Sequence, residues 1–192
     1  MKKILVVIDM QNDFIDGPLG TPEARAIVPK VCEKIRDGEW SVIHVTMDTH
    51  DGQYLETQEG KKLPVEHCIR YTDGWKLNRK LETALRNSID IYTNGSDGIK
   101  IGTKETFGAV GLAERIENDL NYRNMDQYEI HIVGVCTDIC VISNALILKS
   151  YYPDMKIVVD ASCCAGTTPE MHQKALDVMR SCQIDIINAV ED

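Results

Sequence analysis

Short, continuous runs of apolar residues, rich in β-branched side chains, constrain the fold of this chain more than any other feature. The runs are Ile4–Ile8, Ser41–Thr46, Ile130–Val135, Lys156–Val159 and Asp185–Ala189. A strand with one face in water alternates polar and apolar residues, whereas a strand covered on both faces shows a continuous apolar run. These runs therefore predict buried strands of a parallel sheet.

Segments with helical periodicity separate the runs. Apolar residues recur at helical spacing in Ile27–Asp37, Gly111–Leu120 and Pro169–Ser181. Strands that alternate with helices indicate βαβ units. We expect an α/β fold, a three-layer sandwich with a mostly parallel central sheet. We also expect a single domain over residues 1–192, because a chain of this length builds one sizeable core.

Charge and cysteine content narrow the possible partners and the location. The formal net charge is -9, and no basic cluster interrupts it, so we expect no nucleic-acid partner and no anionic membrane partner. The chain has no run of about 18 apolar residues, so we expect no membrane span. Asp9 and Asn12 interrupt the N-terminal apolar run too early for a signal peptide. The seven cysteines are scattered and odd in number, which favours reduced thiols in a cytoplasm.

Several polar residues follow the predicted strands at their carboxyl ends. Asp9 follows the first strand, Asp48 and His50 follow the second, and the octapeptide GVCTDICV, residues 134–141, follows the Ile130–Val135 strand. Ligands of open parallel sheets bind beyond the carboxyl ends of the strands. A long polar segment with little periodicity, residues 47–76, is expected to cross the same edge. The sequence therefore predicts a site at this edge.

Cys140 is the first candidate residue in the octapeptide. Small residues before it predict a tight turn, and Ile139–Lys149 predicts a helix with Asp138 near its N-cap. A thiol at a helix N-terminus meets the positive end of the helix dipole, which lowers its pKa and favours a nucleophilic thiolate. The backbone N–H groups of Cys136 and Cys140 could hold a developing oxyanion. From the residues alone, a buried structural cysteine or a metal or disulfide pair stays an alternative.

A nucleophilic thiol needs a group that accepts its proton. His44 and His131 fall within predicted strands and have no obvious route to Cys140. Asp9, at the tip of the first strand, is the better geometric candidate, and a carboxylate can act as a base if burial raises its pKa. Lys104, in the predicted loop Gly102–Phe107, could supply a positive charge that holds both groups. A solvated aspartate and a solvated lysine remain the plainer interpretations of these two residues.

The polar segment also holds a possible set of metal ligands. Asp48 and His50 lie one residue apart, so in extended backbone they point the same way. His67 follows later, with Glu56 and Glu59 between them. Carboxylate and imidazole ligands together suit Zn²⁺, Mn²⁺ or Fe²⁺. Because the spacing matches no known finger or protease motif, unrelated surface acids and histidines are the alternative.

Four blocks in order carry a resemblance to a known family. VVIDMQNDF, DTHDGQYLETQEGKKLPVEHC, TKETFG and GVCTDICV resemble the isochorismatase-like cysteine hydrolases, and most closely their nicotinamidase branch, from about residue 3 to about residue 182. That family has an Asp–Lys–Cys triad, and the resemblance assigns it to Asp9, Lys104 and Cys140. It also implies an oxyanion hole from the backbone amides of Cys136 and Cys140, after a cis peptide bond between Val135 and Cys136.

The resemblance extends to the metal site and to the substrate pocket. It implies metal ligands at Asp48, His50 and His67, with Glu59 preferred over Glu56 as the further carboxylate. It implies a divalent metal, zinc first, with manganese or iron as alternatives. Aromatic residues that wall the family's pocket suggest that the residues contacting a flat substrate are Phe14, Trp75 and Tyr71, the last standing where glycine is common.

The activity that the resemblance implies is hydrolysis of nicotinamide to nicotinate and ammonia through a cysteine thioester, within NAD salvage. The partners expected are a small amide substrate and further copies of the chain in a homo-oligomer. One alternative is another small amide or an N-carbamoyl substrate, which would keep the triad and lose the metal. Hydrolysis of the isochorismate vinyl ether is a second alternative, although it needs no cysteine at position 140. A third is a non-catalytic binding protein that retains the fold.

Overall fold

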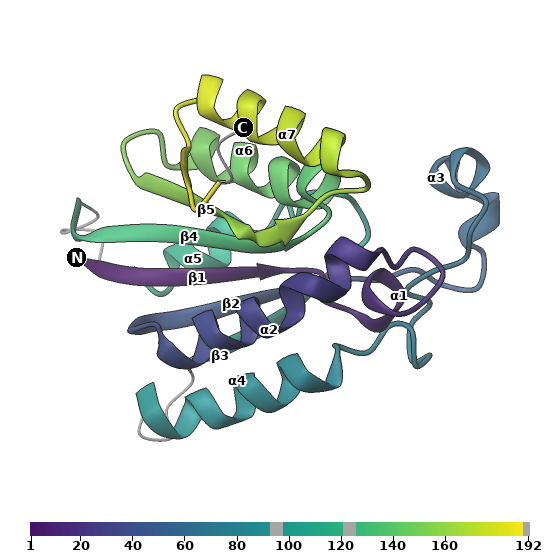
Figure 1. Ribbon diagram of the computed structural model, residues 1–192, viewed down its shortest axis with the longest axis horizontal. Coiled ribbons are helices and arrows are strands. Elements are labelled where there is room, and N and C mark those ends of the chain that lie inside the picture. The colour runs from purple at the N-terminus through teal and green to yellow at the C-terminus, as the bar shows by residue number, and fades with distance from the viewer. Residues whose placement is uncertain (93–97, 121–125, 190–192) are drawn as a thin grey trace.

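A parallel sheet forms the central layer of the protein (Figure 1). The computed structural model describes residues 1–92, 98–120 and 126–189, and in these ranges it has six strands in the order β3-β2-β1-β4-β5-β6, each parallel to its neighbours. The strands are β1 Lys2–Ile8, β2 Trp40–Asp48, β3 Ile99–Lys104, β4 Tyr128–Val135, β5 Lys156–Ala165 and β6 Asp185–Ile187.

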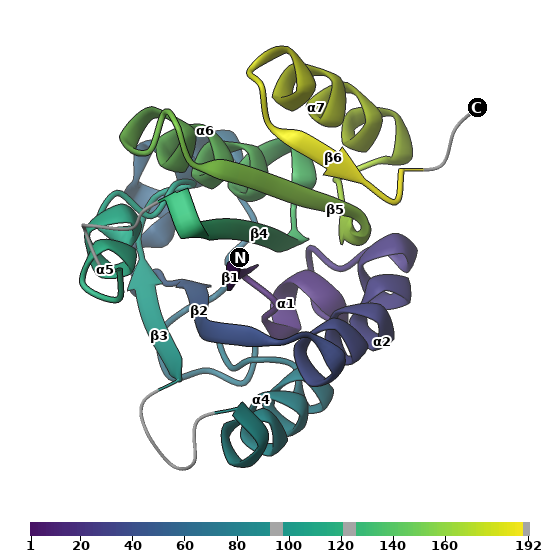
Figure 2. The same ribbon diagram turned by 90° about the vertical axis from the view of Figure 1, so that its left-hand side faces the viewer.

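Helices cover both faces of the sheet, which makes the three layers that the sequence predicts (Figure 2). Helices α2 and α4 pack on one face, and α5, α6 and α7 pack on the other. The helices are α1 Asn12–Ile15, α2 Pro22–Asp37, α3 Gln58–Lys62, α4 Arg79–Tyr92, α5 Leu112–Glu117, α6 Ile142–Tyr151 and α7 Pro169–Ser181, with a 3₁₀ turn, η1 Tyr54–Glu56, and a π-helical turn, η3 Thr137–Val141. None of the helices in the described ranges is both long and apolar enough to cross a membrane.

Strand β1 shows why the apolar runs are continuous. Ile4, Val6 and Ile8 join the core against α5, α6 and α7, whereas Leu5 and Val7 join the core against α2 and α4. Successive side chains of a strand point to opposite faces, so both sets must be apolar where both faces are covered. The side chains from Ile4 to Ile8 are fully buried. The predicted class of fold is therefore confirmed.

Two elements have no counterpart in the sequence prediction. The predicted loop Gly102–Phe107 contains the end of β3, so Lys104 is the last residue of a strand and not a loop residue. β3 lies at the edge of the sheet and mixes apolar with polar residues, so it lacks the continuous run of a buried strand. Helix α4 was also missed, although Leu81, Ala84 and Leu85 are buried at helical spacing.

Several element boundaries also differ from the prediction. Helix α2 begins at Pro22 and not at Ile27, because the Thr21 side chain accepts a hydrogen bond from the Ala24 N–H and caps the helix there. Strand β5 continues past the predicted end at Val159, through a stretch in which Asp160 is paired with Lys34. Strand β6 ends before Asn188, whose φ of 54° leaves the extended region.

His44 is a histidine of β2 buried at the face that α5 covers. Its side chain is 1% exposed, and Nε2 lies 3.0 Å from Oδ2 of Asp119. Burial lowers the pKa of His44 to about 4, although the nearby Asp119 carboxylate opposes this shift. The neutral ring is therefore favoured in the folded protein, and His44 contributes to the core and not to the site.

This burial predicts a specific pH dependence of stability. An unfolded histidine has a pKa of about 6.5, so between that value and about 4 the unfolded chain binds the extra proton. The free energy of unfolding should be constant above that window and fall as the pH decreases through it. Between pH 7 and pH 5, the wild type should lose about 2 kcal/mol more than His44→Gln in urea denaturation. Equal losses in the two proteins would contradict the assignment.

Candidate active site

The carboxyl ends of four neighbouring strands bring the candidate residues together. Asp9 directly follows β1, Asp48 ends β2, Lys104 ends β3, and Cys140 lies in the turn after β4. Asp48 and Lys104 are partners in the register of β2 and β3, and Ile8 pairs with both Thr46 and Gly134 on its two sides. The sheet order β3-β2-β1-β4 thus places residues from distant parts of the chain at one edge.

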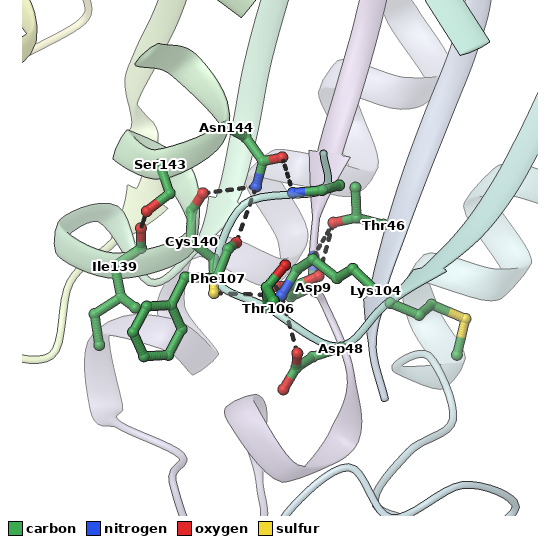
Figure 3. Close-up of polar contacts among 12 residues, drawn as sticks. Asp9, Thr46, Asp48, Lys104, Thr106, Phe107, Ile139, Cys140, Ser143 and Asn144 are labelled. Carbon is green, nitrogen blue, oxygen red and sulfur yellow. Dashed lines mark hydrogen bonds and ion pairs between the residues drawn. The ribbon is translucent and has the colours of Figure 1, made fainter. Parts of the chain in front are cut away.

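Lys104 stands at the centre of the group (Figure 3). Its Nζ lies 2.7 Å from Oδ2 of Asp9, 3.0 Å from Oδ1 of Asp48 and 3.6 Å from Sγ of Cys140. The side chains of Asp9 and Lys104 are almost completely buried, at 0% and 2% exposure. The structure therefore brings the three residues of the expected triad, Asp9, Lys104 and Cys140, into one buried cluster.

Burial sets the protonation of these groups. It raises the pKa of Asp9, although the charge of Lys104 opposes the rise. Burial also raises the pKa of the Cys140 thiol well above its usual value, and the carboxylate of Asp9 adds to this shift. Burial alone would lower the pKa of Lys104, but electrostatic interactions with Asp9, Cys140 and Asp48 have a larger, opposite effect. The pKa of Lys104 is therefore raised, and its ammonium group stays charged.

The position of Cys140 near a helix N-terminus predicts a lowered pKa for the thiol, and this prediction is wrong, because burial raises that pKa. A thiol that stays protonated needs a base beside it.

Oδ1 of Asp9 accepts a hydrogen bond of 2.7 Å from the hydroxyl of Thr46. Oδ2 is buried and, apart from its ion pair with Lys104, receives no hydrogen bond from the described residues.

The backbone before Cys140 has the shape that the resemblance implies. The peptide bond between Val135 and Cys136 is cis. Gly134 has a φ of 126°, and a Cβ atom at this position would lie 2.1 Å from the carbonyl oxygen of Ile8. Only glycine fits this close approach of β4 to β1. Cys136 and Cys140 then line the same cavity, as an oxyanion hole built from their amides requires.

Asp138 has a different role from the expected helix cap. The residue at the N-cap position is Cys136, with no side-chain capping bond. The Asp138 carboxylate instead accepts hydrogen bonds of 2.8 and 2.6 Å from the backbone N–H and the hydroxyl of Thr167. It therefore ties the turn that carries Cys140 to the loop before α7.

Asn144 and Thr46 are site residues that the sequence analysis missed. The Asn144 side chain donates to the carbonyl oxygen of Cys140 at 2.8 Å and accepts from the N–H of Ala109 at 2.9 Å (Figure 3). It thereby joins the helix after the thiol to the loop after β3. The spacing of four residues between Cys140 and Asn144 could have revealed the first contact, because residues four apart lie on the same face of a helix. Thr46 is the last residue of the predicted strand Ser41–Thr46. Its contact with Asp9 could be predicted only from the order of the strands in the sheet.

The predicted metal ligands also converge at this edge. Ligand atoms of Asp48, His50 and His67 all lie within 4.8 Å of one another. Oε1 of Glu59 is 3.9 Å from Nε2 of both histidines, whereas Glu56 is exposed. The geometry therefore favours Glu59 over Glu56, in line with the expectation. Tyr54, fully buried, packs against both imidazoles at ring distances of 4.6 and 4.9 Å.

Hydrogen bonds leave this cluster ready to accept a cation. The Nδ1–H of His67 donates to the Val65 carbonyl oxygen at 2.8 Å, so Nε2, the atom that faces the cluster, has a free lone pair in the neutral ring. Burial acts against the Asp48 carboxylate, but the imidazoles of His50 and His67, whose Nε2 atoms lie 2.9 and 3.5 Å from its Oδ2, outweigh it and lower the pKa of Asp48. One carboxylate, two imidazoles and a nearby glutamate match the ligands of zinc and similar divalent ions. The residues therefore fit the expected metal.

A cavity of about 370 Å³ joins the thiol to this cluster. Its volume is in the range of small-molecule sites, and most of its lining is apolar. The lining residues are Phe14, Pro18, Leu19, Gly20, Thr21, Asp48, Glu59, Leu63, His67, Phe107, Cys136, Ile139, Cys140 and Thr167. A larger hollow of about 640 Å³ lies between α2 and α4, but it contains none of the candidate catalytic or metal residues.

Only one of the three predicted aromatic walls lines this cavity. Phe14 lines it and packs against His67 with ring centroids 5.5 Å apart. Tyr71 and Trp75 are not among the lining residues. Tyr71 is 79% exposed and packs on Trp75, and the indole N–H of Trp75 donates to the hydroxyl of Thr49 at 2.8 Å. That hydrogen bond anchors the 71–75 turn outside the cavity, so we correct both assignments.

Fold and site together define the class of protein, a cysteine hydrolase with a three-layer α/β sandwich, whose candidate nucleophile lies in one cluster with a buried aspartate and a buried lysine. Residues 3–191 match the family model of the isochorismatase domain. The chain belongs to the isochorismatase family. This membership confirms the resemblance carried by the four sequence blocks.

Individual relatives agree with this membership. The isochorismatase family protein PncA of Bacillus subtilis is 32% identical over 183 residues, which cover 92% of this chain and 93% of that protein. The solved pyrazinamidase/nicotinamidase of Streptococcus mutans is 28% identical, with a TM-score of 0.74 over 97% of this chain and 100% of its own. The pyrazinamidase of Pyrococcus horikoshii in complex with zinc is 24% identical and has a TM-score of 0.74 over 98% of this chain and 100% of its own, a likeness that shows the fold.

The central position of Lys104 predicts a large effect on stability. Lys104→Met would leave the buried carboxylates of Asp9 and Asp48 together without a neutralising charge. We expect the free energy of unfolding of the metal-free protein to fall by about 3–5 kcal/mol at neutral pH. Urea denaturation in the presence of a chelator measures this change. Adding Asp9→Asn to the variant should recover part of the loss, because one buried charge is removed.

Lys100→Met is the matched control. Lys100 lies in the same strand and pairs with Asp119, but its side chain is 37% exposed. Pairs at the surface contribute about 0–1 kcal/mol, so loss of this half-buried pair should cost much less stability than Lys104→Met. Similar losses in the Lys100 and Lys104 variants would show that Lys104 does not neutralise the buried cluster.

Proposed function

We propose that this protein hydrolyses nicotinamide to nicotinate and ammonia through a thioester on Cys140. The observation that carries the proposal is the contact of one buried lysine, Lys104, with Asp9 at 2.7 Å and with Cys140 at 3.6 Å. The Cys140 side of this cluster lines a cavity that also contains three of the candidate metal ligands. Relatives named as nicotinamidases support the choice of substrate. An amide is the substrate class that a thiol nucleophile with an adjacent acid–base group attacks.

The first half of the reaction forms the thioester. Asp9 accepts the proton of the Cys140 thiol, and Sγ forms a bond to the carboxamide carbon. The charge that develops on the substrate oxygen is held by the backbone N–H groups of Cys136 and Cys140. The bond from carbon to nitrogen then breaks, and the proton on Asp9 moves to the nitrogen, which leaves as ammonia.

The second half releases the acid. A water molecule gives a proton to Asp9 as its oxygen bonds to the thioester carbon. The bond from carbon to sulfur then breaks, and Asp9 returns the proton to the sulfur of Cys140. The acid leaves as nicotinate after its remaining proton passes to the solvent. Lys104 keeps its charge throughout, and it stabilises whichever of the two partners is ionised.

The ligand cluster would orient the substrate. Asp48, His50, His67 and Glu59 would hold a divalent cation, zinc before manganese or iron, which supplies a coordination position for the nitrogen of a pyridine ring. Phe14 packs beside His67 at the cavity wall, where it can contact the face of such a ring. Correct placement of a small substrate contributes several kcal/mol to the rate, at the upper end about 7–11 kcal/mol.

The proposal includes the wider setting of the enzyme. We propose a single domain over residues 1–192, a role in the salvage of NAD, a cytoplasmic location and a homo-oligomeric state. An odd number of cysteines, seven, supports a reducing compartment, because paired disulfides use an even number. The role in salvage rests on the proposed product, because a free pyridine carboxylate can re-enter cofactor synthesis.

Release of ammonia and nicotinate from nicotinamide by the purified protein tests the proposal. Cys140→Ala should lower kcat by about a thousandfold or more, because the nucleophile is removed. Cys136→Ala is the matched control, since this cysteine lines the same cavity but supplies only its backbone. It should retain most of the activity. Chelation should suppress turnover, and added zinc should restore it.

Each contrary result has a separate meaning. Full turnover by Cys140→Ala would remove the thiol from the mechanism. If the wild type released no ammonia while iodoacetamide still alkylated Cys140, nicotinamide would be the wrong substrate. An N-carbamoyl amine or another small amide would then be tested next. Turnover that is indifferent to chelation would remove the metal from the proposal.

A further inference from the structure

The segment Gln11–Phe14 begins two residues after Asp9, and the mechanism uses only its Phe14. Gln11 is completely buried. Its side-chain amide accepts from the N–H of Asp48 at 2.7 Å and donates to the carbonyl oxygen of Asp48 at 2.8 Å. It also donates to the carbonyl oxygen of Trp75 at 2.8 Å. The side chain therefore pairs with both backbone groups of one residue, as a neighbouring strand would.

Asp13 makes a comparable contact on the other side of the ligand cluster. Its Oδ2 accepts a hydrogen bond of 2.8 Å from the N–H of Cys68, the residue after His67. Gly74 packs against the same carboxylate, and a Cβ atom there would lie 2.1 Å from Oδ2. Glycine at position 74 thus leaves the space that the Asp13 carboxylate occupies.

The two ligand-bearing segments are also joined to each other. The N–H of His50 donates to the carbonyl oxygen of Cys68 at 3.0 Å, and the N–H of Arg70 donates to the carbonyl oxygen of His50 at 2.8 Å. One segment holds Asp48 and His50, and the other holds His67. Gln11 binds the first segment and Asp13 binds the second segment, so residues 11–13 contact both segments that carry the ligands.

We infer that Gln11 and Asp13 are positioning residues of the metal site, which fix Asp48 and His67 relative to each other and to Asp9. This inference rests on the metal cluster of the proposed function. Neither side chain is a ligand, and each acts through the backbone of a ligand or of the residue next to it. Partners of this kind that orient metal ligands typically change metal affinity by about ten- to a hundredfold when they are removed.

Asn12 provides a control within the same segment. Its side-chain N–H donates to the carbonyl oxygen of Asp73 at 2.8 Å, in an exposed turn that carries no candidate ligand. Loss of this contact disturbs the same loop without releasing either ligand-bearing segment. A role for Gln11 and Asp13 in general loop stability would therefore extend to Asn12, whereas a role in ligand placement would not.

The test is the zinc affinity of the full chain, measured by competition with a chromophoric chelator. Gln11→Met and Asp13→Ala should weaken zinc binding by about ten- to a hundredfold, and Asn12→Ala should bind as tightly as the wild type. Asp13→Asn should retain most of the affinity, because the amide oxygen still accepts the hydrogen bond from Cys68. In metal-free protein, all these variants should keep the far-UV circular dichroism spectrum of the wild type, so that a loss of zinc affinity does not reflect unfolding.

A substitution in another segment keeps the test decisive if Gln11→Met fails to fold. Gly74→Ala would displace the Asp13 carboxylate from outside the segment and should weaken zinc binding in the same way. Wild-type affinity in both Gln11→Met and Asp13→Ala would overturn the inference, and so would an equal loss in Asn12→Ala. If the wild type itself bound no zinc, the metal part of the proposed function would fail, and the inference would fall with it.

Discussion

A single buried ammonium group holds the functional edge of this protein together. Lys104 ends β3, and its Nζ contacts carboxylates at the ends of the next two strands, β2 and β1. Without this ammonium group, the two carboxylates and the thiol, which are buried away from water, would repel one another or bind protons. The lysine allows Asp9 to remain near Cys140 and allows Asp48 to remain ionised for a cation. Both halves of the site therefore depend on one charge.

Asp48 connects the two halves. Its Oδ1 contacts Lys104 at 3.0 Å, and its Oδ2 contacts His50 at 2.9 Å. The group that would bind the substrate ring and the group that would break the amide bond are therefore held by opposite oxygens of one carboxylate. A rigid link of this kind suits a reaction in which a small flat substrate must place its carbonyl carbon accurately beside a sulfur atom.

Much of the fold could be predicted from the sequence, because buried parallel strands leave a direct pattern in it. The edge strand β3 could not, since only one of its sides has a strand neighbour and its residues are mixed. Asp9 and Cys140 could be predicted because Asp9 directly follows one recognisable strand and Cys140 lies in the turn after another. The pKa of Cys140 was predicted in the wrong direction, because burial depends on layers that are far apart in the sequence.

Contacts across the chain explain the remaining differences. Gln11 pairs with Asp48 across 37 positions and Asp13 with Cys68 across 55, and no local pattern reports such pairs. Tyr71 and Trp75 were placed in the pocket by resemblance, but the hydrogen bond from Trp75 to Thr49 anchors their turn outside it. Motif position thus indicates which residues come near a site, whereas the hydrogen bonds decide which of them enter it.

The most direct test of this account is mass spectrometry of enzyme that is quenched with acid during turnover of nicotinamide. We predict a nicotinoyl group on the peptide that contains Cys140, joined as a thioester and released by hydroxylamine. The adduct should be absent when substrate is omitted. Continued turnover with no acyl group on Cys140, or with the acyl group on another residue, would contradict the account.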